Sequence, residues 1–197
     1  MDRLTHALAE IDAANSADPA SIRWQGRDVP AALAYGRRMS EMLDRVDPEA
    51  SELLRLAARA QHIRRWEIPR SAYPMDRPGY LRWRKELGRK HAEWAGEILD
   101  RCGYEPADVQ RVGTLLRKEN LRHDAETQAL EDTAALVFLA HYAEEFAAAH
   151  PADKVIDILV KTLRKMSERG RAAAGTLVLP PPVQSALEAA LAQKAAP

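Results

Sequence analysis

The stretch from Thr133 to Ala140, TAALVFLA, is apolar almost all the way round a helix. A helix that faces water keeps a polar face, so a helix without one is expected to be buried on every side. We therefore predict a central core helix that runs from about Glu126 to Ala149 and is ended by His150 and Pro151.

Amphipathic helices are predicted on both sides of this core helix, because apolar residues recur at the spacing of one helix face. No segment has a convincing strand pattern, and residues 16–28 are expected to form a loop. Proline and glycine residues mark the ends of the segments. The predicted helices cover about residues 2–15, 30–46, 49–65, 77–102, 106–122, 152–166 and 183–194.

The sequence thus predicts an all-α protein with a single-domain helical bundle over residues 1–179. A chain of 197 residues is long enough to bury a substantial core within one domain. Pro180, Pro181 and Pro182 predict a stiff spacer, so residues 180–197 are expected to form a proline-initiated C-terminal helix and tail.

Cys102 is the only cysteine, which excludes an intramolecular disulfide and a multi-cysteine metal site. The first 15 residues include Asp2, Glu10 and Asp12 and lack the pattern of a signal peptide. No stretch approaches the roughly 20 apolar residues that span a bilayer. We therefore expect a cytoplasmic protein with no membrane partner.

Charge is unevenly distributed along the chain. The formal net charge is +0, yet residues 59–90 contain ten basic and three acidic side chains. Such a local field attracts small anions, although the same charges could simply solvate a helix face. The zero net charge, without aromatic residues interleaved among the basic ones, argues against a nucleic-acid partner.

Three residues stand out as candidates for chemistry. His62 and His91 lie on apolar helix faces next to the basic segment, and Asp132 enters the predicted core helix. A buried carboxylate is costly unless it is paired, caps a helix or binds a metal. The alternative is structural, with two hydrogen-bonded core histidines and an aspartate that favours a helix N-terminus or pairs with an arginine.

The order and spacing of these residues resemble the HD superfamily of metal-dependent phosphohydrolases. The segment 57–63 looks like the helix that carries the adjacent His-Asp pair, His91 is similar to a later histidine, and Asp132 is similar to the closing aspartate. Over about residues 30–145, the resemblance implies an HD-domain or phosphodiesterase-like fold. It also implies that His62, His91 and Asp132 act as catalytic residues and hold one divalent metal ion.

The sequence departs from the HD pattern at two places. Gln61 and His62 stand where that pattern has His and Asp, and no histidine occurs near Tyr35, where an earlier helix would supply one. Glutamine is a poor metal ligand, and the lost carboxylate weakens the charge balance around a divalent cation. The resemblance therefore implies a reduced metal site.

A second resemblance covers nearly the whole chain. The segments QHIRRWEIPR (residues 61–70), YPMDR (73–77) and LED (130–132) are similar to the signature of an uncharacterised family, domain of unknown function 4202. This resemblance implies no particular activity.

The first functional hypothesis is a metal-dependent hydrolase of a small phosphorylated or nucleotide-like substrate, with a reduced site at His62, His91 and Asp132. Arginine forks match phosphate oxygens, and a histidine can move protons near pH 7. The candidate ligand-binding residues are Arg64, Arg65, Trp66, Lys90 and Lys118.

The alternative is a non-catalytic regulatory protein that binds a small anion or nucleotide. In that hypothesis Arg64 and Arg65 bind the charge, and Trp66 stacks on a base. A third, structural possibility is that the basic segment and the C-terminal helix form contacts in a homodimer.

Overall fold

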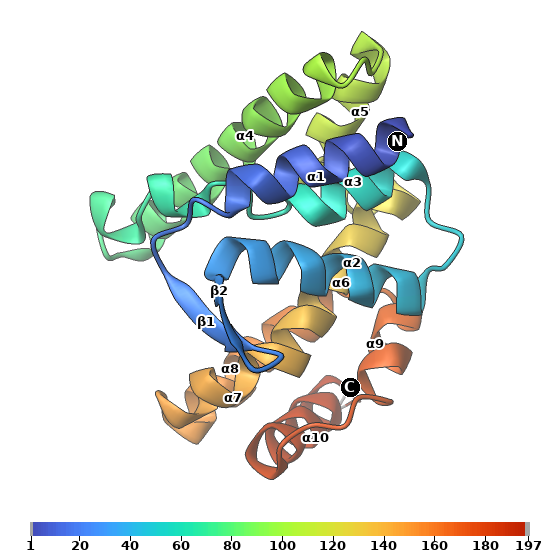
Figure 1. Ribbon diagram of the computed structural model, residues 1–197. Coiled ribbons are helices and arrows are strands. Elements are labelled where there is room, and N and C mark those ends of the chain that lie inside the picture. The colour runs from blue at the N-terminus through green and yellow to red at the C-terminus, as the bar shows by residue number, and fades with distance from the viewer. Residues whose placement is uncertain (1, 196–197) are drawn as a thin grey trace. The chain divides into compact units, whose positions relative to one another are not determined.

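The computed structural model describes residues 2–195 and is mostly helical (Figure 1). Residues up to Leu130 pack as one compact unit, and the chain from Glu131 onward packs as a second. Helix α6 (Ala125–His141) begins in the first unit and continues into the second. The domain boundary predicted at residue 179 stays a prediction.

The N-terminal unit contains five helices besides the start of α6, one hairpin and two short 3-10 turns within its described residues. They are α1 (Arg3–Asn15), β1 (Ser21–Trp24), β2 (Arg27–Pro30), α2 (Ala31–Val46), α3 (Glu52–Ala60), η1 (Arg65–Glu67), η2 (Arg70–Ala72), α4 (Arg77–Arg101) and α5 (Pro106–Arg117).

The hairpin corrects the prediction of an all-α chain with a loop over residues 16–28. Strands β1 and β2 pair antiparallel, with Ile22 opposite Val29. The turn between them places Gln25 at φ 49° and Gly26 at φ 76°. A two-residue hairpin turn of this hand needs two positive φ values, and Gln-Gly is a weaker signal for it than Asn-Gly. Each strand has only four residues, too few for a clear alternation.

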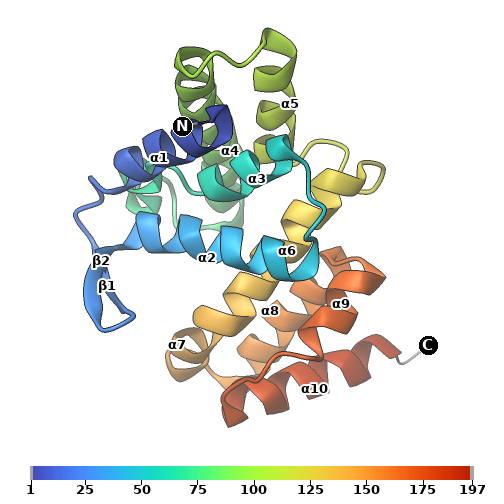
Figure 2. The ribbon, with the colours of Figure 1, turned by 45° about the vertical axis from the view of Figure 1, so that its right-hand side comes forward.

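Helix α3 organises the core of the N-terminal unit, because it contacts α1, α2 and α5 while α4 packs along α5 (Figure 2). Leu54 and Leu56 of α3 are almost completely buried, as are Leu99 of α4 and Leu115 of α5. Burying each of these side chains contributes about 1.5–3 kcal/mol. This packing fixes the separation of α4 and α5, and the candidate site lies between their side chains.

Helix α3 ends at Ala60, five residues before the predicted end at Arg65. The chain turns because Arg64 adopts a left-handed conformation, with φ 50°. The Arg64 backbone N–H donates instead to the side-chain Oδ1 of Asn15, at 3.1 Å. As a result, Gln61 and His62 lie on a turn rather than on a helix face.

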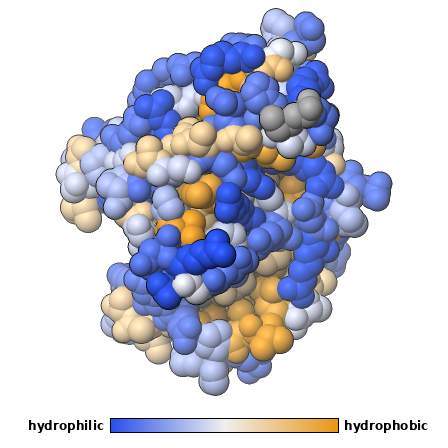
Figure 3. Space-filling model, viewed as in Figure 1, coloured by the Kyte–Doolittle hydropathy of each residue, from blue (hydrophilic) through white to orange (hydrophobic). Residues whose placement is uncertain are grey.

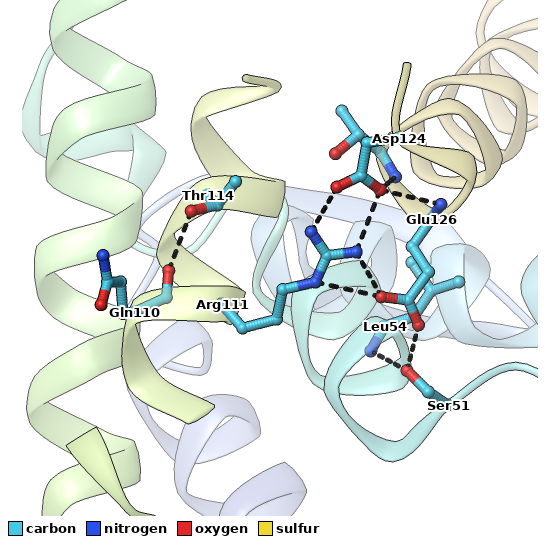
Figure 4. Close-up of polar contacts among 8 residues, drawn as sticks. Ser51, Leu54, Gln110, Arg111, Thr114, Asp124 and Glu126 are labelled. Atoms are coloured by element: carbon cyan, nitrogen blue, oxygen red, sulfur yellow. Dashed lines mark hydrogen bonds and ion pairs between the residues drawn. The ribbon is translucent and has the colours of Figure 1, made fainter. Parts of the chain in front are cut away.

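A charged network joins α5 to the starts of α3 and α6 (Figure 4). The Arg111 guanidinium donates to Asp124 at 2.9 Å and to Glu126 at 3.1 Å. Glu126 also accepts from Ser51, the residue that caps α3 by accepting from the Leu54 N–H at 3.1 Å. Hydrogen bonding to Asp124 raises the pKa of Arg111, and the same contact lowers the pKa of Asp124. The network therefore fixes the starts of α3 and α6 against the middle of α5.

The C-terminal unit contains the rest of α6 followed by α7 (Ala143–Ala148), α8 (Ala152–Lys165), α9 (Glu168–Ala174) and α10 (Pro181–Ala195). The helix predicted over residues 126–149 is divided at Tyr142, which has φ −130° and ends α6. Helix α10 packs against α8 and α7. Val183 and Leu187 are buried there, so the C-terminal helix is docked rather than frayed.

Most of the surface in the view of Figure 3 is hydrophilic, and hydrophobic residues gather toward the lower part, where Figure 1 shows α10. Across residues 2–195, no helix combines the length and apolar character needed to cross a membrane.

Candidate functional site

The N-terminal unit contains a cavity of about 300 Å³. Its wall is built by the turn after α3, the 3-10 turn η1, the middle of α4 and the C-terminal end of α5. The polar lining residues are Gln61 and His62 from the turn, Arg65 from η1, Arg84, Lys85 and His91 from α4, and Arg117 and Lys118 from the end of α5.

Among the described residues, the lining contains five cationic side chains and no carboxylate. Arg65 is half-buried: its guanidinium carbon lies 4.6 Å from the centre of the Trp83 ring, and its Nη1 lies 3.5 Å from His62 Nε2. Burial, together with the nearby Arg84 cation, lowers the pKa of Arg65. Arg117 pairs with Glu119 at 2.7 Å. Glu119 thus balances the charge of Arg117 from outside the lining, and the remaining cations make the wall positive.

Two histidines form the inner part of the wall. The His62 ring stacks on Tyr35, with centroids 3.9 Å apart, and its centroid lies 6.0 Å from that of His91. Burial, followed by the positive charge of Arg65, lowers the pKa of His62 well below its usual value. The same causes lower the pKa of His91 to about 3. Both rings are therefore neutral at pH 7 and carry a lone pair.

Two buried polar atoms of this wall have no hydrogen-bond partner among the described residues. They are Gln61 Oε1 and His91 Nε2, in side chains of residues that are 6% and 4% exposed. Buried polar atoms in folded proteins nearly always have a partner, and each exception calls for an explanation. A ligand in the cavity would supply one.

The sequence profile of one protein family, described as Domain of unknown function (DUF4202), matches residues 5–187. The chain belongs to the DUF4202 family. Its sequence matches no curated protein and no solved structure. The similarity of this DUF4202 member to HD phosphohydrolases therefore stays a prediction from the residues quoted above.

Four of the predicted site residues of the DUF4202 chain line the cavity together, namely His62, His91, Arg65 and Lys118. Three other predicted ligand-binding residues are not in the lining. Arg64 donates to Glu67 at 2.6 Å and lies over the Trp94 ring, Lys90 pairs with Glu93 at 2.9 Å, and Trp66 lies in η1.

Asp132 has a structural role within the C-terminal unit. Its carboxylate accepts from the backbone N–H of Ser167 at 2.9 Å and also from the Ser167 hydroxyl. Ser167 is the N-cap of α9 and accepts from the Gly170 N–H at 3.0 Å. A carboxylate at a helix N-terminus is favourable because unsatisfied N–H groups point toward it.

The donor set of the cavity does not fit a divalent cation. Its neutral histidines could act as ligands, but the five cations would repel the metal and no carboxylate balances its charge. Within residues 2–195, no group of three or more His, Cys, Asp or Glu side chains could hold a metal ion. Metal binding by His62, His91 and Asp132 stays a prediction from the HD resemblance.

Sequence reasoning missed part of the wall that α4 and α5 contribute. Arg84, Gly88 and His91 are spaced four and three residues apart, so they share one face of α4, and this spacing could have linked Arg84 to the histidine. No helical spacing in the sequence linked Arg117 to the histidines. Arg117 reaches the cavity only because α5 packs along α4.

Proposed function

We propose that the cavity of this DUF4202 member binds a small phosphorylated compound through its negative charge. The observation that carries the proposal is the convergence of five cationic side chains from η1, α4 and the end of α5, with no carboxylate among them. Arginine guanidinium groups donate paired hydrogen bonds to phosphate oxygens, and lysines add point charges.

Electrostatic repulsion among the lining cations favours the binding of an anion in the cavity. Arg65 and Arg84 lie close enough for one cation to lower the pKa of the other. A bound phosphate would relieve this repulsion and replace the hydration that Arg65 loses through burial. The cavity volume of about 300 Å³ is at the lower end for ligand sites, which favours a compact ligand over a dinucleotide.

Hydrolysis of the bound phosphoester, suggested by the HD resemblance, is a second candidate function. The observation that favours it is the placement of two histidine rings in the wall beside the cations, because an imidazole next to a bound phosphate can transfer a proton. Measuring phosphate release from small phosphorylated sugars, with and without added Mn²⁺ or Fe²⁺, would test this candidate separately from binding.

The Arg65→Gln variant should bind inorganic pyrophosphate at least tenfold more weakly than the wild type in a calorimetric titration. A hydrogen bond to a charged group contributes about 1.5–3 kcal/mol, and tenfold corresponds to about 1.4 kcal/mol. The matched control is Arg82→Gln, at an exposed arginine of α4 that is outside the lining. Equal affinities in the two variants would contradict the proposal.

The Lys118→Gly variant should weaken ligand binding without destabilising the fold. Lys118 ends α5 in a left-handed conformation, with φ 55° and ψ 42°. This conformation costs a non-glycine residue about 1–2 kcal/mol. We therefore expect Lys118→Gly to leave the free energy of unfolding unchanged or raise it by about 1 kcal/mol, while pyrophosphate affinity falls several-fold.

Asn120→Gly is the matched control for this variant, because Asn120 also has a positive φ, 54°, but does not line the cavity. Urea unfolding and calorimetric titration measure the two properties independently. A Lys118→Gly protein that binds pyrophosphate as tightly as Asn120→Gly would remove Lys118 from the site.

A further inference from the structure

The cations of the cavity cannot satisfy every polar group in its wall. Arginine and lysine side chains only donate hydrogen bonds, so they suit the oxygens of a phosphate. Gln61 Oε1 only accepts, and it has no partner among the described residues. A fully deprotonated phosphate group has no hydrogen to donate and would leave this oxygen unpaired.

We propose that the ligand carries a hydroxyl group beside its phosphate, and that this hydroxyl donates to Gln61 Oε1. The ligand class is then a small phosphorylated polyol or sugar. This inference rests on the phosphate site proposed above and adds a second, neutral recognition point to it.

Gln61 is suited to recognising a hydroxyl group because the fold fixes the position of its backbone. Its backbone N–H donates to the Ala58 carbonyl at 3.3 Å at the end of α3, and the residue is only 6% exposed. It is followed by His62 in the wall and by the fully buried Ile63. A backbone anchored in this way moves little on binding, so the unpaired side-chain oxygen that it carries selects for a donor.

His91 Nε2 extends the same recognition. One nitrogen of a neutral imidazole donates and the other accepts, so His91 Nε2 suits either a second hydroxyl or a phosphate oxygen. Gln61, His91 and the cations line one cavity of about 300 Å³. The hydroxyl and the phosphate must therefore lie a few bonds apart in the ligand.

The test compares two ligands that differ in their hydroxyl groups, glycerol 3-phosphate and propyl phosphate. In calorimetric titrations of the wild-type protein, glycerol 3-phosphate should bind about tenfold more tightly, the upper range for one added hydrogen bond. In the Gln61→Met variant, which keeps the side-chain length without the acceptor, the preference for glycerol 3-phosphate should fall several-fold. The change should come from weaker binding of glycerol 3-phosphate.

A second variant keeps the test decisive if Gln61→Met folds poorly, which circular dichroism would reveal. Gln61→Glu retains acceptor oxygens but adds negative charge, so it should weaken both ligands while preserving the preference for glycerol 3-phosphate. Loss of the preference in Gln61→Glu would overturn the assignment of Gln61 as an acceptor.

The outcomes distinguish the two proposals. Equal binding of both ligands to the wild type, with both weakened by Arg65→Gln, would overturn the hydroxyl inference and leave the phosphate site standing. Binding of neither ligand, or binding that Arg65→Gln does not change, would overturn the phosphate site and the inference with it.

Discussion

The free energy of unfolding should fall as the pH drops from about 6.5 to 5. The folded protein holds His62 and His91 neutral, because burial and the Arg65 cation lower both pKa values, that of His91 to about 3. In the unfolded chain a histidine titrates near 6.5. Below that pH the unfolded state binds more protons, so folding becomes less favourable.

The sign and the window follow from these pKa shifts. The contribution to stability is fully present above the unfolded pKa of 6.5 and is lost as the pH falls toward the lowered folded values. The slope has an upper limit of about 1.4 kcal/mol per pH unit for each histidine. Between pH 5 and 6.5 most carboxylates of an unfolded chain are already ionised, so the histidines dominate this interval.

Urea unfolding at a series of pH values would measure the slope. The variant His91→Gln should reduce it by about half, since one of two contributing groups is removed. His123→Gln, at an exposed histidine, is the control. An unchanged slope in His91→Gln would show that this ring is accessible to protons in the folded protein.

Replacing Asp132 by alanine should destabilise the C-terminal unit by about 3 kcal/mol, since two charge-assisted hydrogen bonds to Ser167 are lost. Asp132 is 7% exposed, so water cannot readily replace the carboxylate. Pyrophosphate affinity should stay unchanged. Asp153→Ala, at an exposed carboxylate in the first turn of α8, is the control and should change stability by a few tenths of a kcal/mol.

Gly170 provides a coupled test of the same contact. A Cβ atom at this position would lie 2.5 Å from Asp132 Cγ, so Gly170→Ala should also destabilise the unit. In the Asp132→Ala background the clash is gone, and the second substitution should cost much less. If the two substitutions lower the free energy of unfolding additively, the contact between Gly170 and Asp132 is contradicted.

Metal coordination by Asp132 has a separate test. A metal content that falls in both Asp132→Ala and His62→Ala would support it.

The sequence predicted those parts of the fold that depend on local patterning. The predicted range of residues 77–102 agrees closely with α4 because its capping residue Asp76 and its final turn are both visible in the sequence. The end of α3 was not predictable in this way. It depends on a hydrogen bond between Arg64 and Asn15, which are 49 positions apart.

The residues of the candidate site also divide into those that local sequence indicates and those that depend on tertiary packing. His62, Arg65 and His91 attracted attention through residue type and charge, whereas Arg117 depends on the packing of α5 along α4. The contact between Asp132 and Ser167 could not be predicted, because Ser167 caps a seven-residue helix with no clear periodicity. Tertiary contacts, rather than local propensity, decide these cases.

The β1–β2 hairpin affects the tendency of this protein to aggregate at high concentration. Within the part of the chain that the structure describes, each strand of the two-stranded sheet has one edge without a paired strand, and such an edge is a template for strand addition by a neighbouring molecule. The edges here are short, and Arg23, Arg27 and Asp28 are exposed along them. Short, charged edges are poor templates for intermolecular pairing, so the hairpin can stand on the surface without promoting aggregation.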